Sequence, residues 1–120
     1  MNKPKVLFID DEADCFRCFI NELGNMGLNI IRTFSNGQEA AEYISTGDYD
    51  AAIIDRRLGG DSALGYIDGE ELMEMLKKYN PKAKVISFCG YNDKPLYADR
   101  VLPKPPLPKD LQEIVNYINS

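Results

Sequence analysis

Three aspartates stand at points of the sequence where their carboxylates would converge. Asp10 and Asp11 follow the apolar run Val6–Ile9, and Asp55 follows a second apolar run, Ala51–Ile54. Neighbouring parallel strands end at the same edge of a sheet, and α/β folds bind their ligands at that edge. Two carboxylates about 4 Å apart repel each other by roughly 4 kcal/mol at a protein surface. Such a group calls for a divalent cation, a shared proton or a lysine, and Mg²⁺ prefers oxygen ligands of this kind.

Apolar segments alternate with segments of helical pattern, and this alternation would bring the acids together. The predicted strands are residues 6–9, 28–34, 50–55, 85–89 and 101–102. The predicted helices, in which apolar residues recur every three or four positions, are residues 16–24, 36–47, 70–79 and 108–118. Parallel strands need crossover connections, which are usually helices. The sequence therefore predicts an α/β fold with a parallel sheet and helices on both faces.

Local signals set several ends of these elements. Asn36 followed by Glu39 is typical of a helix start. Gly24 and Gly47 are expected to end the helices that precede them. Between the fourth and fifth strands, Pro95 interrupts a segment that is already too short for a full helix. The helix that a regular alternation would place there is therefore expected to be reduced or missing.

The composition is that of an ordinary globular domain. The chain has 120 residues, of which 44% are hydrophobic and 28% charged, and its net charge is −5. This length predicts a single domain over residues 1–120. The Lys and Arg residues are scattered, which argues against direct binding to nucleic acid, and the segment before the first strand is too short for a signal or membrane segment. We therefore expect a cytoplasmic protein with no membrane segment, whose three cysteines are free thiols.

Four landmarks, taken in sequence order, resemble the receiver domains of two-component response regulators. They are Phe8–Glu12 after the first strand, Asp55 after the third, Cys89–Tyr91 after the fourth and Lys104–Pro105 after the fifth. The resemblance covers nearly the whole chain, and the four landmarks together are far more specific than any one of them. It implies a flavodoxin-like, doubly wound, five-stranded parallel sheet of the (βα)5 type, here with a reduced or missing fourth helix.

The resemblance also implies a role for each landmark residue. Asp55 would accept a phosphoryl group from a sensor histidine kinase or a phosphotransfer protein, and Lys104 would bind the phosphoryl oxygens. Asp11 and Asp55 would ligate Mg²⁺ directly, Asp10 would act through water, and the backbone carbonyl of Arg57 would complete the protein ligands. Such a phosphoacceptor is not an enzyme and catalyses at most its own phosphorylation and dephosphorylation. The residue types suit this reaction, because phosphoryl transfer needs a positioned nucleophile and neutralised charge.

Three features depart from the family pattern at positions that transmit the signal. Cys89 stands where receivers carry a Ser or Thr hydroxyl, unless a shifted alignment gives that place to Ser87. Val101 stands where receivers carry an aromatic ring. A long glycine-rich stretch, residues 56–68, separates Asp55 from the next helix and is expected to form a lid or a partner-docking loop. We therefore expect slow or unusual switching.

Other interpretations of the sequence stay open. Cys89, Val101 and the reduced fourth helix also fit a receiver-like interaction module that binds a partner without regulated phosphorylation. Cys15 and Cys18 have the spacing of a thiol redox motif near the start of a helix, although the flanking pattern of thioredoxin-like proteins is absent. A strand-end aspartate is also the nucleophile of haloacid-dehalogenase-type phosphatases, but Asp10 followed by Glu12 matches their motif imperfectly.

Overall fold

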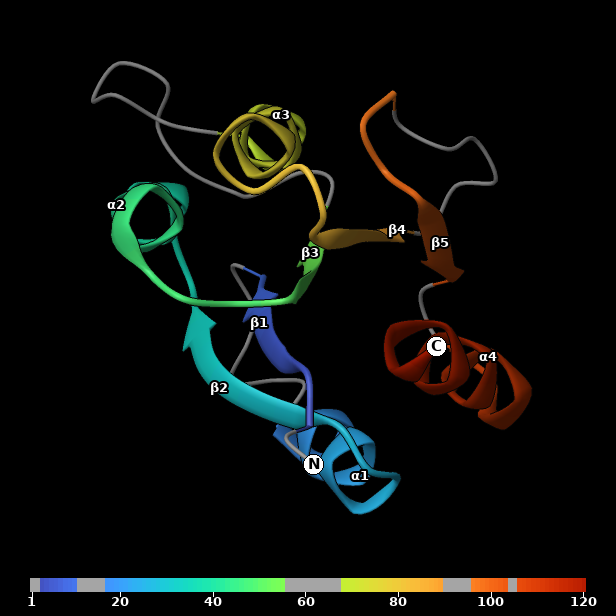
Figure 1. The fold of residues 1–120 in the computed structure, drawn as a ribbon. Coiled ribbons are helices and arrows are strands. Elements are labelled where there is room, and N and C mark those ends of the chain that lie inside the picture. The colour runs from blue at the N-terminus through green and yellow to red at the C-terminus, as the bar shows by residue number, and fades with distance from the viewer. Residues whose placement is uncertain (1–2, 11–16, 56–67, 90–95, 104–105) are drawn as a thin grey trace.

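A five-stranded parallel sheet forms the centre of the computed structural model, which describes residues 3–10, 17–55, 68–89, 96–103 and 106–120 (Figure 1). The strands are β1 (Lys5–Ile9), β2 (Asn29–Phe34), β3 (Ala51–Asp55), β4 (Lys84–Cys89) and β5 (Arg100–Pro103). The helices are α1 (Arg17–Asn25), α2 (Gly37–Thr46), α3 (Gly69–Tyr79) and α4 (Pro108–Asn119). The strand order is β2-β1-β3-β4-β5. This order is the doubly wound, flavodoxin-like arrangement that the sequence predicts.

Two apolar clusters lie on opposite faces of the sheet. Helices α2 and α3 cover one face, and α1 and α4 cover the other (Figure 1). Leu72 of α3 shares the first cluster with Leu7, and Ile114 of α4 shares the second with Phe8. Because successive strand residues point to opposite faces and both faces are covered, β1 and β3 are continuous apolar runs rather than alternating ones.

The ends of α2 and α3 follow their sequence signals. The side chain of Asn36 accepts a hydrogen bond from the backbone N–H of Glu39 at 2.9 Å, which confirms the predicted helix start. At the other end of α2, the N–H of Gly47 donates to the carbonyl of Tyr43. Helix α3 begins after Asp68, whose carboxylate accepts from the N–H of Gly69 at 2.8 Å. Side chains and backbone thus satisfy helix-end groups that have no partner within the helix.

The end of α1 differs from the prediction. Gly24 lies inside the helix, which continues to Asn25. The chain turns at Gly27 instead, whose φ of 109° is a left-handed conformation that glycine adopts without strain. The N–H of Leu28 donates to the carbonyl of Leu23 at 3.1 Å, and the N–H of Gly27 donates to that of Gly24 at 3.1 Å. These paired bonds form a Schellman motif, which ends the helix after Gly24 rather than at it.

The connection between β4 and β5 contains no helix in its described part, Leu96–Asp99. The prediction of a reduced or missing helix is confirmed for these residues, whereas residues 90–95 lie outside the described part of the chain. The glycine-rich stretch predicted as a lid or docking loop lies outside it as well, except for its last residue, Asp68. None of the helices in the described ranges has the length and apolarity that a membrane-spanning helix requires.

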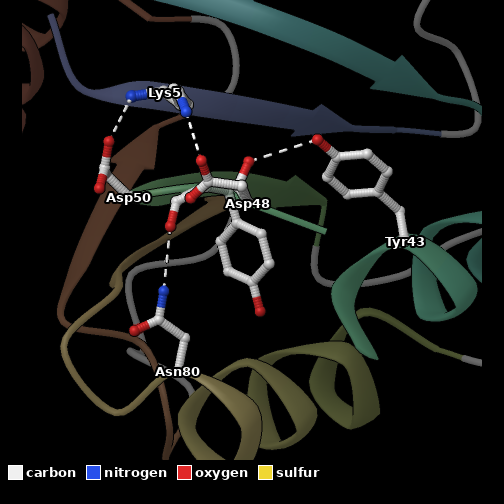
Figure 2. A network of polar contacts seen from close by, with 6 residues as sticks. Lys5, Tyr43, Asp48, Asp50 and Asn80 are labelled. Atoms are coloured by element: carbon white, nitrogen blue, oxygen red, sulfur yellow. Dashed lines mark hydrogen bonds and ion pairs between the residues drawn. The ribbon is translucent and has the colours of Figure 1, made fainter. Parts of the chain in front are cut away.

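Polar contacts join several elements at the amino ends of the strands (Figure 2). The side chain of Lys5 forms an ion pair with Asp48, and its backbone N–H donates to the carboxylate of Asp50 at 2.7 Å. The side-chain amide of Asn80 donates to the backbone carbonyl of Tyr49 at 3.0 Å. These contacts tie β1 and the end of α3 to the segment that leads into β3.

Candidate functional site

The carboxyl ends of β1 and β3 bring Asp10 and Asp55 together. Backbone pairing puts Ile9 opposite Ile54, so that the next residue of each segment, Asp10 and Asp55, stands beside the other. The strand order reverses between β1 and β3, because the chain continues to β2 on one side and to β4 on the other. Open α/β sheets bind ligands in the crevice at such a point. The predicted convergence of these two acids is therefore what the fold produces.

Asp55 is the last residue of β3, and Asp10 directly follows the last residue of β1. Asp10 has an exposed fraction of 0% and Asp55 of 8%. The apolar residues that precede them, Val6–Ile9 and Ala51–Ile54, are fully buried, so each acid follows directly from the core. The backbone N–H of Asp10 also donates to the carbonyl of Phe34 at 3.0 Å, which holds it against the end of β2.

Two buried carboxylates side by side form a site that favours a cation. Like charges repel most strongly where water is excluded, and oxygen donors suit a hard ion such as Mg²⁺. Asp11 and the carbonyl of Arg57, the other predicted ligands, lie outside the described residues. Within the described ranges, no three side chains of His, Cys, Asp or Glu gather closely enough to hold a metal ion. The two carboxylates fit a magnesium site in their chemistry, with Asp55 as an oxygen ligand and Asp10 close enough in the sheet register to act through water.

Two further predicted site residues belong to the carboxyl ends of β4 and β5. Cys89 is the last residue of β4, and its backbone pairs with Pro103 of β5. Asp55 pairs with Phe88 in the same ladder of strands, so positions 88, 89 and 103 reach the edge where Asp55 lies. Lys104 comes directly after Pro103 but lies outside the described residues, as does the side chain of Cys89. Their roles stay predictions.

Ser87 is a buried hydroxyl one position before the level of Asp55. Its exposed fraction is 0%, and its backbone pairs with Ile54 and Val101 on the neighbouring strands. Its Oγ is the one fully buried side-chain oxygen or nitrogen in the described part of the chain that has no hydrogen-bond partner. Leaving such a group unpaired costs about 1–3 kcal/mol. Ser87 entered the sequence analysis only through a shifted alignment, because sequence alone cannot tell which hydroxyls are buried without a partner.

Three aromatic rings pack beneath the acids on the face that α1 and α4 cover. The ring of Phe8 contacts those of Phe19 and Phe88 at centroid distances of 5.8 and 6.0 Å, and Phe19 stacks on Phe88 at 5.4 Å. Phe88 pairs with Asp55 in the sheet, so this cluster supports the site from below. Phe88 was not among the predicted site residues. Its position directly before the landmark that begins at Cys89 is the sequence feature that could have indicated it.

The structure does not place the two cysteines of the predicted thiol redox motif near each other or apart. Cys18, on α1, is exposed and carries a free thiol, whereas Cys15 lies outside the described residues. The two cysteines therefore cannot be placed relative to each other, and a redox role stays a hypothesis from spacing alone.

Sequence comparison identifies the family. The model of the response regulator receiver domain matches residues 6–116. The chain therefore belongs to the response regulator receiver domain family, a signalling family of two-component systems. Among curated proteins, none matches the sequence.

Solved receiver domains have the same fold over almost the whole chain. The receiver domain of the Francisella response regulator 1452 is 26% identical, with a TM-score of 0.75 over 98% of this chain and 97% of that one. The receiver domain of AraT, a response regulator from Geobacillus stearothermophilus, is 25% identical, with a TM-score of 0.78 over 98% and 94%. A CheY-like receiver domain protein from Methanospirillum hungatei, 23% identical, is similar in fold, with a TM-score of 0.78 over 97% and 93%.

Proposed function

We propose that Asp55 accepts a phosphoryl group from a sensor histidine kinase or a phosphotransfer protein in a Mg²⁺-dependent reaction. The observation that carries this proposal is the pair of buried carboxylates, Asp10 and Asp55, at the point where the strand order of a receiver domain reverses. A carboxylate oxygen of Asp55 attacks the phosphorus atom and a P–O bond forms. The P–N bond of the donor's phosphohistidine breaks, and its electron pair returns to the imidazole, whose other nitrogen carries a proton.

The other site residues hold the reactants and balance their charge. Asp10, fixed by its backbone bond to Phe34, contributes to the magnesium site through water, while Asp11, Asp55 and the carbonyl of Arg57 are direct ligands. Bound Mg²⁺ supplies electrostatic stabilisation of the transferring phosphoryl oxygens. Lys104 binds those oxygens from the end of β5. These assignments rest on the resemblance of the landmark residues to those of the family.

The switch that follows phosphorylation is atypical. Receivers place a Ser or Thr hydroxyl near the phosphoryl group, and here the sequence offers Cys89 at that position and Ser87 two residues earlier. The thiol of Cys89 is a weak hydrogen-bond donor, which accounts for a slow or unusual response. The buried hydroxyl of Ser87, which has no hydrogen-bond partner among the described residues, is the alternative donor. Val101, half-buried beside it on β5, replaces the aromatic ring that usually moves with the hydroxyl.

The chain acts as one receiver unit over residues 1–120 in the cytoplasm. It catalyses at most its own phosphorylation and dephosphorylation, and its output passes through a protein partner. Scattered cations and a net charge of −5 favour neither nucleic acid nor an anionic membrane as that partner.

A second candidate is an interaction module that uses the receiver fold without regulated phosphorylation. Two observations favour it: the described connection between β4 and β5 contains no helix, and Val101 stands where the family carries an aromatic ring. Both affect the part of the fold that transmits the signal rather than the acids that accept the phosphoryl group.

The deciding experiment combines chemical phosphorylation with amide NMR. The purified chain is treated with acetyl phosphate and Mg²⁺, and intact-mass spectrometry measures the gain of one phosphoryl group. Amide spectra are then recorded with and without beryllofluoride in the presence of Mg²⁺. Asp55→Asn removes the acceptor, and Asp50→Asn is a matched control, because it neutralises an acid at the opposite edge of the sheet.

We expect phosphorylation and Mg²⁺-dependent shifts around Asp10, Asp55 and Cys89 in the wild type and in Asp50→Asn, and neither in Asp55→Asn. A folded wild-type protein that gains no phosphoryl group and does not respond to beryllofluoride would support the interaction module. Phosphorylation that persists in Asp55→Asn would contradict the assignment of the acceptor.

A further inference from the structure

A groove lies between the first turns of α3 and the segment that leads into β5. Its volume is about 280 Å³, and it is lined by Glu70, Glu71, Met73, Glu74, Leu96 and Tyr97. Figure 1 shows this segment beside α3, on the sheet face that α2 and α3 cover. The groove is separate from the carboxylates of Asp10 and Asp55, neither of which lines it.

Asp99 holds one wall of the groove in place. Its carboxylate accepts from the backbone N–H of Val85 at 2.8 Å and from Nζ of Lys77 at 2.7 Å. Its backbone N–H donates to the carbonyl of Val85 at 2.7 Å. The preceding residue, Ala98, is buried in the apolar cluster under α2 and α3. Leu96 and Tyr97 therefore project from an anchored segment, which joins β4, β5 and the end of α3.

Two large apolar side chains of the groove are exposed to solvent. Leu96 has an exposed fraction of 85% and Tyr97 of 37%, and both are among the few large apolar residues exposed in the described part of the chain. They stand next to each other and next to Met73, which is itself buried. Isolated exposed apolar residues are common, but adjacent ones at a groove are typical of a binding surface.

The charged residues that line the groove are all acidic. Glu70 and Glu71 lie in the first turn of α3, where the helix dipole favours negative charge. The dipole does not account for Glu74 in the next turn, and Glu71 and Glu74, three positions apart on the helix, are spaced so that their like charges repel. In the described part of the chain, Glu71 and Glu74 form no ion pair that would offset this. A cation brought by a partner would relieve the repulsion.

We propose that this groove binds a basic amphipathic helix of a partner protein. Its apolar side chains would contact Leu96, Tyr97 and Met73, and its Lys or Arg residues would pair with Glu71 and Glu74. The groove is smaller than the roughly 300–1,000 Å³ of typical small-molecule sites, which favours a few inserted side chains over a cofactor. Glu71 and Glu74 are three residues apart, about 4.5 Å along α3, which matches the spacing of cations one turn apart on a helix laid alongside it.

The test uses two synthetic peptides and amide NMR of the unphosphorylated chain, so that its result does not depend on the function of Asp55. One peptide contains Leu and Lys at amphipathic helical spacing, and the other has the same composition in scrambled order. The groove variants are Glu71→Lys with Glu74→Lys, and Leu96→Ser with Tyr97→Ser. Their matched controls are Glu22→Lys with Glu113→Lys, on α1 and α4, and Leu107→Ser, which changes another exposed apolar residue.

We expect the amphipathic peptide to shift the amides of Glu70–Glu74 and Leu96–Ala98. Each groove variant should weaken its binding by about tenfold, whereas the control variants should change it by less than about twofold. Shifts spread evenly over the surface, equal binding of the scrambled peptide, or equal weakening by the charge controls would overturn the proposal. So would a wild-type dimer in sedimentation velocity that Leu96→Ser with Tyr97→Ser dissociates, because the occupant would then be a second copy of the chain. Amide spectra of the free variants verify that they fold.

Discussion

The two edges of the central sheet use charge in opposite ways, and the amino edge uses it for assembly. There, Lys5 pairs with Asp48 and contacts Asp50, as Figure 2 shows. Lys84, at the start of β4, donates from Nζ to the carbonyls of Tyr117 and Ser120 at 2.9 and 2.8 Å. A cation at the end of α4 complements the helix dipole and satisfies carbonyls that the helix leaves free. Lys5 and Lys84 thus each bind a partner that secures one element to another.

At the carboxyl edge, by contrast, two charges of the same sign meet. Asp10 and Asp55 carry the same charge, stand side by side and are buried. The hydroxyl of Ser87, one position further into the sheet, has no partner within the described residues. Natural proteins retain such costly arrangements where function requires them. The difference between the edges therefore indicates that stability is secured at one end of the strands and chemistry at the other.

Removing one acid from each edge tests this difference most strongly. Without Mg²⁺, Asp55→Ala should raise the free energy of unfolding by about 1–3 kcal/mol, because it relieves repulsion with Asp10. Asp50→Ala should lower it by about 1 kcal/mol, because the backbone N–H of Lys5 loses its acceptor. Urea unfolding monitored by circular dichroism measures both. Added Mg²⁺ should stabilise the wild type but not Asp55→Ala. If both variants are destabilised, the conclusion that the two edges use charge differently is wrong.

Ser87→Ala examines the carboxyl edge without changing its charge. Removing a buried hydroxyl that has no partner should raise the free energy of unfolding by about 1 kcal/mol, and the cavity left is small. Ser45→Ala is the control, because that hydroxyl is exposed and donates to the carbonyl of Glu42. The response of the two variants to beryllofluoride shows which residue acts in the switch. If Ser87→Ala abolishes the response, the hydroxyl of Ser87 rather than the thiol of Cys89 is the hydrogen-bond donor of the switch. A clear loss of stability would instead mean that Ser87 has a partner in the folded protein.

Alkaline pH should lower the free energy of unfolding through groups at the amino edge, and this effect should be smaller than those of the two preceding predictions. Burial raises the pKa of Tyr49 above its ordinary value of 10.0, and the hydrogen bond and charge of Asp48 raise the pKa of Lys5 above 10.5. Above these ordinary values the unfolded chain loses protons before the folded chain does, so stability falls as the pH rises. Urea unfolding from pH 8 to 11 should therefore show a decline above about pH 10. Tyr49→Phe should make that decline shallower, whereas Tyr79→Phe, which changes an exposed ring, should leave it unchanged. A decline of the same steepness in both variants would exclude Tyr49 as a cause.

Much of the fold could be predicted because its signals are local. The apolar runs that became β1 and β3, the cap at Asn36 and the proline that opens α4 each depend on a few neighbouring residues. The end of α1 could not be predicted in this way. Gly24 and Gly27 are both plausible helix ends by residue type, and only the hydrogen bonds of the observed turn distinguish them.

For the candidate site, the sequence determined the residue types and their order: acids after two apolar runs, a landmark at Cys89, and a lysine between prolines. That order was sufficient for the family, because strand ends meet at one edge in any parallel sheet of this connectivity. Tertiary structure alone decided the burial of Asp10 and Asp55, the packing of Phe88 and the groove beside α3. It also decided that Ser87 is buried without a hydrogen-bond partner in the described part of the chain. Burial and pairing depend on segments that are far apart along the chain, and a pattern of neighbouring residues contains no record of those contacts.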